Sequence, residues 1–398
     1  MKKAILKALS VMLVVVLTLT AAPLSGFVGL ELPEWLDFSI KSSAATSGTC
    51  GENVYWDFDE STGTLTISGS GAMSGDYTYN GPWDGIVNNI KTIVISDNVT
   101  TIGDNRFNGC TNLTSVTIPD SVTTIGHQAF SFCDSLTSVT IPDSVTTIGS
   151  SAFWHCVSLT SVTIPNGVTT IGDDAFEDCT SLTSVTIGDS VTSIGEGAFA
   201  GCDSLISITI PDGVKTIGEQ TFYMCTSLTS VTIPDSVISI GEQAFAFCKS
   251  LMSVIIPNNV TSIGYGTFFG CESLTSVTIG NSVGTIGEVA FYGCSSLINV
   301  TIGDSVTTIG RSAFQYCSSL NSVTIPDSVT SIGEGAFGGC DSLISITISD
   351  SVTSIGEGTF DFYNSLTDVY YSGTEKQWKK ISFGKYNYGL FDAQFILM

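Results

Sequence analysis

Apolar and polar residues follow one another along this chain in a pattern that returns every 23 residues. The unit over residues 136–158 reads LTSVTIPDSVTTIGSSAFWHCVS. Val139 and Ile141 lie two residues apart, and the neighbouring Ser138 and Thr140 are polar and compatible with a strand. Alternation at this period predicts a short strand whose apolar side chains face a core and whose hydroxyls face solvent.

A turn and a second extended segment are predicted to follow this strand. Pro142 ends the strand, and Asp143 with Ser144 supplies turn chemistry. Val145 and Ile148 then indicate a second short segment whose apolar side chains point inward.

The end of each unit is predicted to be a compact turn. Gly149 recurs in every copy, which indicates either a positive φ or a close approach of two backbones. Ala152, Phe153 and Cys156 are spaced as in one helical or 3-10 turn, with the phenylalanine and the cysteine facing inward. We therefore expect the phenylalanines of successive units to form one continuous stack.

The same unit recurs without insertion or deletion through most of the chain. Eleven cysteines from Cys110 to Cys340 and twelve phenylalanines from Phe107 to Phe360 keep the 23-residue spacing. A fixed period in this range, kept by apolar residues and glycine, is typical of a solenoid of stacked coils. The sequence therefore predicts a β-rich solenoid of about twelve 23-residue coils, with short parallel strands and one short helical or 3-10 turn per coil.

Both ends of such an array expose apolar surface and need a cap. Before the repeats, apolar residues that alternate around Trp56 and Ile67 predict a β-hairpin with its turn at 59–63. After the repeats the period dissolves, because Tyr363 stands where the cysteine recurs. Further apolar residues are then available to close that end: Trp378, Ile381, Phe383 and Phe391.

The chain is accordingly divided into four parts. We assign residues 1–45 to a signal peptide and linker, 46–89 to the N-terminal β-hairpin cap, 90–365 to the solenoid, and 366–398 to a degenerate last repeat with the C-terminal cap. A solenoid of this length counts as one domain, because each coil buries its apolar face only against its neighbours.

The repeated pattern LxxVxIPxxVxxIGxxAFxxCxS resembles the BspA-type leucine-rich repeat over residues 90–371. The stretch from Gly48 to Trp56 resembles the N-terminal cap often found before such arrays, and Val369 to Gly373 with Trp378 resembles their usual C-terminal closure. The resemblance implies an exported or surface-exposed bacterial protein of a family in which several members are linked to adhesion and to binding of host or matrix proteins. It implies no catalytic residues.

The first residues have the pattern of an export signal. Lys2, Lys3 and Lys7 precede an apolar run over residues 8–22. Cleavage is expected either after Ala22 or in the small-residue stretch that ends at Ala45, and an uncleaved signal anchor is the alternative. No second apolar run is long enough to span a membrane, so the mature protein is expected to be secreted or held at the cell surface without a span.

The charge limits the partners. The chain carries 13 Lys and Arg against 37 Asp and Glu, a net charge of −24. Nucleic acid and anionic membranes would be repelled, whereas a basic partner or a divalent cation stays open. We expect a monomer that needs no cofactor.

The row of cysteines has two interpretations. Neighbouring coils lie about 5 Å apart, within the range that permits a disulfide. Eleven members cannot all pair along one row, however, and a buried cysteine packs as a small apolar side chain. We therefore expect reduced thiols, and no metal site, because one thiol per coil does not supply a tetrahedral ligand set.

A row of carboxylates follows the first strand of most units. Its aspartates suit the turn through local hydrogen bonds, and calcium binding is the alternative, since oxygen-rich rows suit that ion. The row comprises Asp97, Asp120, Asp143, Asp189, Asp212, Asp235, Asp304, Asp327 and Asp350, with asparagine at 166, 258 and 281.

The units differ most at the two positions between phenylalanine and cysteine. Large side chains there are either contact points for a protein or glycan, or a shield over the edge of the coils. These candidate binding residues are Phe132, Trp154, His155, Tyr223, Met224, Phe247, Phe269, Tyr292 and Tyr316. The outward Ser and Thr of the strands lack the aromatic or Arg anchors of a specific interface.

Catalysis is not expected. The two histidines, His127 and His155, occupy different unit positions, and no Ser or Cys nucleophile lies beside a base and an orienting group. The sequence thus favours an exported binding or adhesion module for an extracellular protein or glycan, with a passive surface spacer as the alternative.

Overall fold

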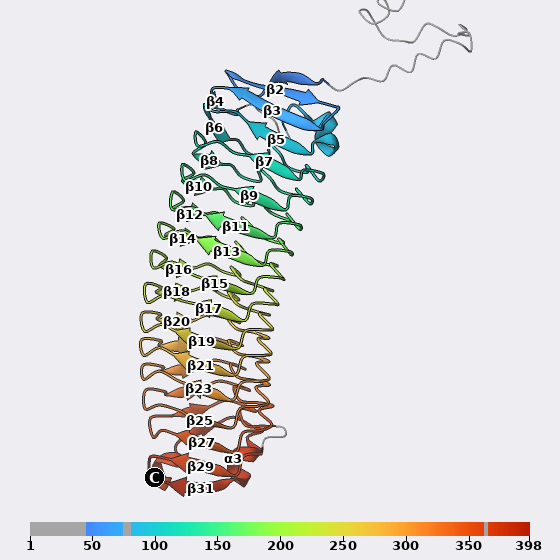
Figure 1. The fold of residues 1–398 in the computed structure, drawn as a ribbon. Coiled ribbons are helices and arrows are strands. Elements are labelled where there is room, and N and C mark those ends of the chain that lie inside the picture. Colours follow the sequence, from blue (N-terminus) through green and yellow to red (C-terminus); the bar gives the residue numbers. More distant parts are fainter. Residues whose placement is uncertain (1–44, 75–80, 362–364) are drawn as a thin grey trace, which may run out of the picture. The chain divides into compact units, whose positions relative to one another are not determined.

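The structure is a computed structural model that describes residues 45–74, 81–361 and 365–398. In this part the chain winds through a stack of coils, about 13 turns of about 23 residues each (Figure 1). Each repeat contributes one strand to a first row of parallel strands and a second strand to a second row. The predicted β-rich solenoid is confirmed. The signal peptide and linker expected before Ala45 lie outside the described residues.

The strands of the first row are β5 (Thr92–Ile95), β7 (Ser115–Thr117), β9 (Ser138–Thr140), β11 (Ser161–Ile164), β13 (Ser184–Ile187), β15 (Ser207–Thr209), β17 (Ser230–Thr232), β19 (Ser253–Ile256), β21 (Ser276–Ile279), β23 (Asn299–Thr301), β25 (Ser322–Thr324), β27 (Ser345–Ile348), β29 (Asp368–Tyr371) and β31 (Gln394–Leu397). Those of the second row are β6 (Val99–Ile102), β8 (Thr124–Ile125), β10 (Thr147–Ile148), β12 (Thr170–Ile171), β14 (Ser193–Ile194), β16 (Thr216–Ile217), β18 (Ser239–Ile240), β20 (Ser262–Ile263), β22 (Thr285–Ile286), β24 (Thr308–Ile309), β26 (Ser331–Ile332), β28 (Ser354–Ile355) and β30 (Ser382–Phe383).

The strands pair in the register that the repeat dictates. Val162 of β11 lies opposite Val139 on one side and Val185 on the other, each one unit away in sequence. Like residues therefore stack on like residues, with valine and isoleucine inward and serine and threonine outward. The second row is hydrogen-bonded from β4 (Gly71–Ala72) to β30, whereas the first row is interrupted between β7 and β9, β17 and β19, and β23 and β25.

The interior contains the expected phenylalanine stack. Rings of neighbouring coils from Phe107 to Phe360 are 5.1 to 5.7 Å apart between centroids, and every one of these side chains is fully buried. Trp83, which the sequence analysis did not place, extends the stack by lying 5.4 Å from Phe107. Trp56 then meets the edge of Trp83 at 5.9 Å. The N-terminal end of the stack is thus closed by two tryptophans.

The segment from the repeated glycine to the repeated cysteine, 149–156 in one coil, is here named the turn edge. The sequence predicts a helical or 3-10 turn in it, and the structure shows a different arrangement. The N–H groups of Ala152, Trp154 and Cys156 donate to carbonyls three residues back, as in a 3-10 turn. Those of Ser151 and His155 donate instead to carbonyls of the next coil.

Three N–H groups of this segment bond to the next coil: those of Ser151, Phe153 and His155. Ser151 and His155 have φ of 54° and 58°, whereas Phe153 makes the same kind of bond without a positive φ. A 3-10 helix would direct all of its N–H groups along one chain. Here every second group bonds to the neighbouring coil, so the turn edge helps to hold the stack together.

The structure shows which of the two explanations for the repeated glycine, positive φ or close backbone approach, holds at Gly149. Its φ is not positive. A Cβ at this position would lie 2.7 Å from the carbonyl carbon of Gly126 and from the amide nitrogen of His127. Close approach of adjacent coils is therefore what requires glycine here.

The expected hairpin lies at the N-terminal end. β2 (Val54–Asp59) pairs antiparallel with β3 (Thr64–Gly69) and with β1 (Ser47–Thr49). β3 pairs in parallel with β5, so the hairpin covers the first coil by continuing its sheet. The 3-10 helix η1 (Asp84–Asn89) leads from the cap into the repeats.

The C-terminal end is closed by α2 (Glu375–Trp378), β30, α3 (Tyr388–Asp392) and β31. Trp378 is half-buried and contacts the rings of Tyr371, Phe383 and Phe395 at 4.8 to 5.3 Å. Ile381 is buried, whereas Phe391 is 55% exposed. Tyr363, expected to replace the cysteine, lies outside the described residues.

Candidate functional site

The turn edge has a backbone conformation that restricts its side chains. The residue just before the repeated cysteine has a positive φ in every coil from Gly109 to Gly339, and in several coils it is glycine, as at Gly109, Gly293 and Gly339. A side chain in this left-handed region costs about 1 kcal/mol or more. Other coils nevertheless carry large side chains there, with φ of 57° to 61°: Phe132, His155, Met224, Phe247 and Tyr316.

The candidate residues form two separate groups along the turn edge. The first, here named the first cluster, consists of Phe132, Trp154 and His155. The ring of Phe132 lies 4.6 Å from that of Trp154 and 5.1 Å from that of His155. The indole nitrogen of Trp154 is shielded from solvent and has no acceptor among the described residues, so this side chain packs as an apolar cover.

The second group, here named the aromatic row, runs over five successive coils and consists of Tyr223, Phe247, Phe269, Tyr292 and Tyr316. Its neighbouring ring centroids are 4.9 to 5.7 Å apart. Phe269 and Tyr292 are stacked with parallel planes, and the other pairs meet edge to face. Such contacts hold the rings as one continuous surface rather than as isolated side chains.

Glycines of the next coil provide the space for two rings of the row. A Cβ on Gly270 would lie 2.9 Å from Cδ1 of Phe247, and one on Gly339 would lie 2.6 Å from Cδ1 of Tyr316. Gly293 has the same backbone conformation, yet a Cβ there would meet only the Cα of Gly270, at 3.9 Å. The positions of the Phe247 and Tyr316 rings therefore depend on the glycine in the next coil.

Two coils separate the two groups, and the first of them is acidic. Asp174, Glu177 and Asp178 lie on its turn edge, and His155 of the first cluster approaches Asp178 at 3.8 Å. Burial, together with the nearby charges of Asp174 and Asp178, raises the pKa of Glu177 to about 7. Burial also raises the pKa of Asp174.

The structure places all nine candidate residues on the turn edge, outside the phenylalanine stack. Met224 and Tyr316 are 43% and 50% exposed, and the other seven are half-buried. The sequence already separates these positions into two groups, because the coils between them carry Glu177–Asp178 and Ala200–Gly201 instead. Which rings touch one another depends on side-chain directions in three dimensions.

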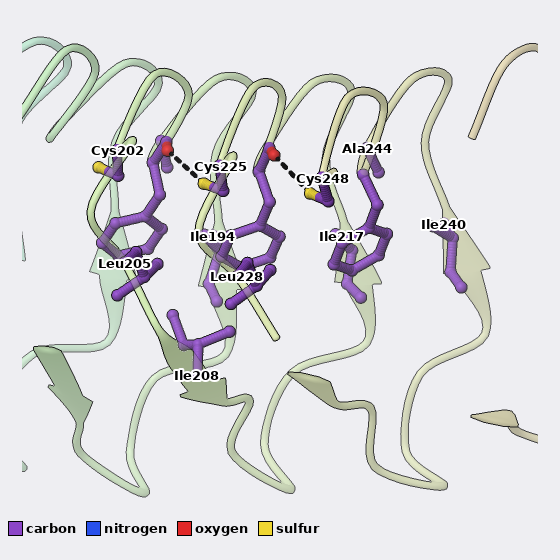
Figure 2. Packing of buried hydrophobic residues seen from close by; sticks show 14 of the residues in the cluster. Ile194, Cys202, Leu205, Ile208, Ile217, Cys225, Leu228, Ile240, Ala244 and Cys248 are labelled. Carbon is purple, nitrogen blue, oxygen red and sulfur yellow. Dashed lines mark hydrogen bonds between the residues drawn. The ribbon is translucent and has the colours of Figure 1, made fainter. Parts of the chain in front are cut away.

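The cysteine row lies inside the coils and does more than fill space. All twelve cysteines of the chain are buried and free. The thiol of Cys225 donates to the carbonyl oxygen of Phe199 at 3.2 Å, and that of Cys248 donates to Phe222 in the same way (Figure 2). Burial raises the pKa of Cys294 to about 12, so this thiol is a weak nucleophile.

The carboxylate row is part of the turns between the two strand rows. Where asparagine replaces aspartate, its side chain bridges coils, as Asn166 does by accepting from the N–H of Asp189 at 2.9 Å. Among the described residues, no three His, Cys, Asp or Glu side chains are grouped as a metal site would require.

The face of the first strand row is mostly hydroxyl, as the sequence predicts, with exceptions that the repeat pattern obscured. Ile255 replaces a threonine and is 69% exposed. Just before these strands, exposed apolar residues occupy every second coil, with threonine or asparagine between them: Ile206, Met252, Ile298 and Ile344.

No helix in the described part of the chain is long and apolar enough to cross a membrane.

Stacked coils with strands, turns and an aliphatic core of this kind define a leucine-rich repeat solenoid. A family model for the BspA type leucine rich repeat region matches residues 86–205, 169–298 and 284–389. Together these matches span most of the chain, and the chain belongs to this family.

Several solved structures resemble this one. A leucine-rich repeat protein from Bacteroides ovatus is 29% identical with a TM-score of 0.62, over 87% of this chain and 99% of that one. One from Eubacterium ventriosum is 26% identical with a TM-score of 0.51, over 81% and 95%. A leucine rich cell surface protein from Faecalibacterium prausnitzii is 32% identical with a TM-score of 0.47, over 86% and 98%. Among curated proteins, none matches this chain.

Proposed function

We propose that this chain is an exported binding protein, secreted or held at the cell surface, that contacts an extracellular protein or glycan through its turn edge. The observation that carries the proposal is the aromatic row. Two of its five members, Phe247 and Tyr316, stand at a backbone position that favours glycine, and each lies over a glycine of the next coil. Strained positions of this kind are more common at functional sites than elsewhere.

The chemistry of the row suits a partner that is partly apolar. Half-buried aromatic rings offer a large contact area at little cost in side-chain entropy, and aromatic residues are enriched at protein interfaces. Tyr223, Tyr292 and Tyr316 add hydroxyls that can bond to a polar partner. Leucine-rich repeat solenoids generally bind proteins, and the repeats of this family are typically non-catalytic.

A binding screen of the mature protein tests the proposal. Purified matrix proteins, host cell-surface proteins and a glycan array are the probes. A partner of the row should bind the parent protein and lose at least about tenfold in affinity when Phe247 and Phe269 are changed to Ser, since buried aromatic anchors dominate interface energetics. A control that removes hydroxyls from the strand face, Thr163→Ala with Thr186→Ala, should bind as the parent does.

Two glycines supply a sharper pair of variants. Gly270→Ala and Gly293→Ala introduce the same strain, because both positions have a φ near 70°. Only Gly270→Ala forces the ring of Phe247 to move. Weakened binding in Gly270→Ala alone supports the row as the site. Equal weakening in both variants, or no partner at all in the screen, contradicts the proposal.

The uniform strand face favours a second candidate function, a passive spacer. Serine and threonine repeat along it nearly without change, as at Ser138, Ser161 and Ser184, and they are exposed. Such a surface needs no specific ligand. A protein that binds nothing in the screen, yet folds normally, would support this function instead.

A further inference from the structure

A groove lies at the C-terminal end of the turn edge, at the end of the array that carries α3 (Figure 1). Its volume is about 490 Å³, and it is here named the end groove. Its walls include Tyr316, the last ring of the aromatic row, and Tyr386, which precedes α3. These tyrosines are 50% and 49% exposed, so both rings are open to a ligand.

Glycines line the groove between the two tyrosines. Gly335, Gly338, Gly339 and Gly358 replace the side chains that other coils carry at the matching turn-edge positions. Gly339 also leaves the space into which the ring of Tyr316 extends. The glycines therefore have two effects: they leave room for the Tyr316 ring, and they leave the groove beside that ring open.

The charge of the groove is strongly unbalanced. Among the described residues that line it, Glu334, Asp341, Glu357 and Asp361 are acidic and Arg311 is the basic one. The guanidinium of Arg311 lies 3.5 Å from Glu334 and 3.9 Å from Glu288, and its side chain is 60% exposed. Arg311 offsets part of the charge of Glu334, and Asp341 with Glu357 still leaves the groove acidic, so the groove attracts cations.

We propose that the end groove binds arginine side chains of a basic, extended peptide segment in the partner protein. A guanidinium is flat, stacks on tyrosine rings, and forms paired hydrogen bonds with carboxylates. The groove combines the two features that this group recognises: two open tyrosine faces and a surplus of carboxylates. The net charge of −24 on the chain would steer such a segment toward the protein.

This inference rests on the proposed function, since Tyr316 belongs to both surfaces, but it is tested separately. The probe is a fluorescently labelled Arg-Gly-Arg-Gly-Arg peptide, and the control probe is the same peptide with citrulline in place of arginine. Citrulline keeps the shape and loses the charge. The mature protein should bind the arginine peptide at least about tenfold more tightly than the citrulline peptide.

Matched variants distinguish a site from general attraction to an acidic protein. Glu334→Gln with Glu357→Gln removes two charges from the groove, and Glu196→Gln with Glu219→Gln removes two from the same coil position elsewhere. The first pair should weaken peptide binding by about three- to tenfold. The second pair should change it by less than about twofold, because distant exposed charges are screened.

Tyr386→Ser is the aromatic test, because Tyr386 lines the groove and does not belong to the aromatic row. It should weaken binding of the arginine peptide by about two- to fivefold. A circular dichroism melt of each variant checks that the fold is kept.

Three results would overturn the inference. They are equal binding of both peptides, equal weakening by both glutamate pairs, and tight binding of a neutral oligosaccharide that is lost in Tyr386→Ser, which would make the groove a glycan site. If the arginine peptide fails while Gly270→Ala still abolishes capture of a protein partner, the proposed function stands and only the end groove is excluded.

Discussion

Two adjacent residues, Phe268 and Phe269, show the difference between the inside and the turn edge of this solenoid. Phe268 is fully buried and stacks between Phe245 and Phe291, with both centroid distances 5.3 Å. Phe269 is half-buried and belongs to the aromatic row, 5.1 Å from Phe247 and 4.9 Å from Tyr292. The two rings have the same chemistry and nearly the same spacing to their neighbours.

The two positions differ in how much the residue varies from coil to coil. The interior ring must fit between identical rings above and below, so every coil carries the same residue there. The position of Phe269 is asparagine, serine, tryptophan, glutamate, alanine, tyrosine, glutamine, glycine or aspartate in other coils, and the fold tolerates all of them. Stability therefore depends on the uniform row, and the binding site proposed above lies on the variable one.

The strongest test of this difference is to replace each ring with alanine in a separate variant. Phe268→Ala should cost about 3–5 kcal/mol, because it leaves a cavity in the stack and removes contacts to two coils. Phe269→Ala should cost less, about 1–2 kcal/mol, because it removes two aromatic pairs worth about 0.5–1.5 kcal/mol each from a half-buried position. Urea unfolding followed by circular dichroism measures both.

The ratio of the two effects is the test. Equal losses of stability would mean that the aromatic row is structural and would remove the main support for a binding role. Phe153→Ala, at an interior position five coils from Phe268, should behave as Phe268→Ala does, since a solenoid sums nearly equal contributions from neighbouring coils.

The repetition explains how much of the fold could be predicted from the sequence. A strict period fixes the coil length, and the coil length fixes the register, so Val139, Val162 and Val185 had to stack. Trp83 could not be placed, because it lies before the first full repeat and only the stack itself shows what it covers. The alternating hydrogen bonds of the turn edge were missed because their signal in residue type is weak: glycine stands at the positions of Ser151 and His155 in only some coils.

The sequence predicted which positions the candidate site uses, but not how their side chains are arranged. The variable residues between phenylalanine and cysteine are visible in the sequence, and the structure places them on one edge. Whether rings such as Tyr292 and Tyr316 touch depends on their direction, and the end groove depends on Tyr386, which lies outside the repeats. No local pattern links residues so far apart.

The buried cysteines provide a second test of the difference between interior and turn edge, with a smaller expected change in stability. Cys225→Ala should cost about 1–2 kcal/mol, because it removes the thiol's hydrogen bond to Phe199 and leaves a small cavity. In the folded protein the twelve buried thiols should resist a thiol-reactive reagent at pH 8, and all should react after unfolding. Met224→Cys, on the turn edge, should react at once. Rapid labelling of the parent protein, or fewer than twelve thiols after unfolding without reductant, would contradict this arrangement.

The smallest expected effect concerns Glu177, on the acidic coil between the two aromatic groups. Burial, with the charges of Asp174 and Asp178, raises its pKa to about 7, so the folded state holds this proton at a pH where the unfolded chain has released it. The folded state is thus stabilised by protonation, and this contribution is lost as the pH rises from about 4.5 to 7. Glu177→Gln cannot ionise and so avoids this loss of stability; the melting temperature of the variant should exceed that of the parent at pH 7 and match it near pH 4.5.

The control is Glu242→Gln, which removes the same charge from an exposed position on another coil. A parallel pH dependence for parent and Glu177→Gln would show that the acidic coil is as well solvated as the rest of the turn edge.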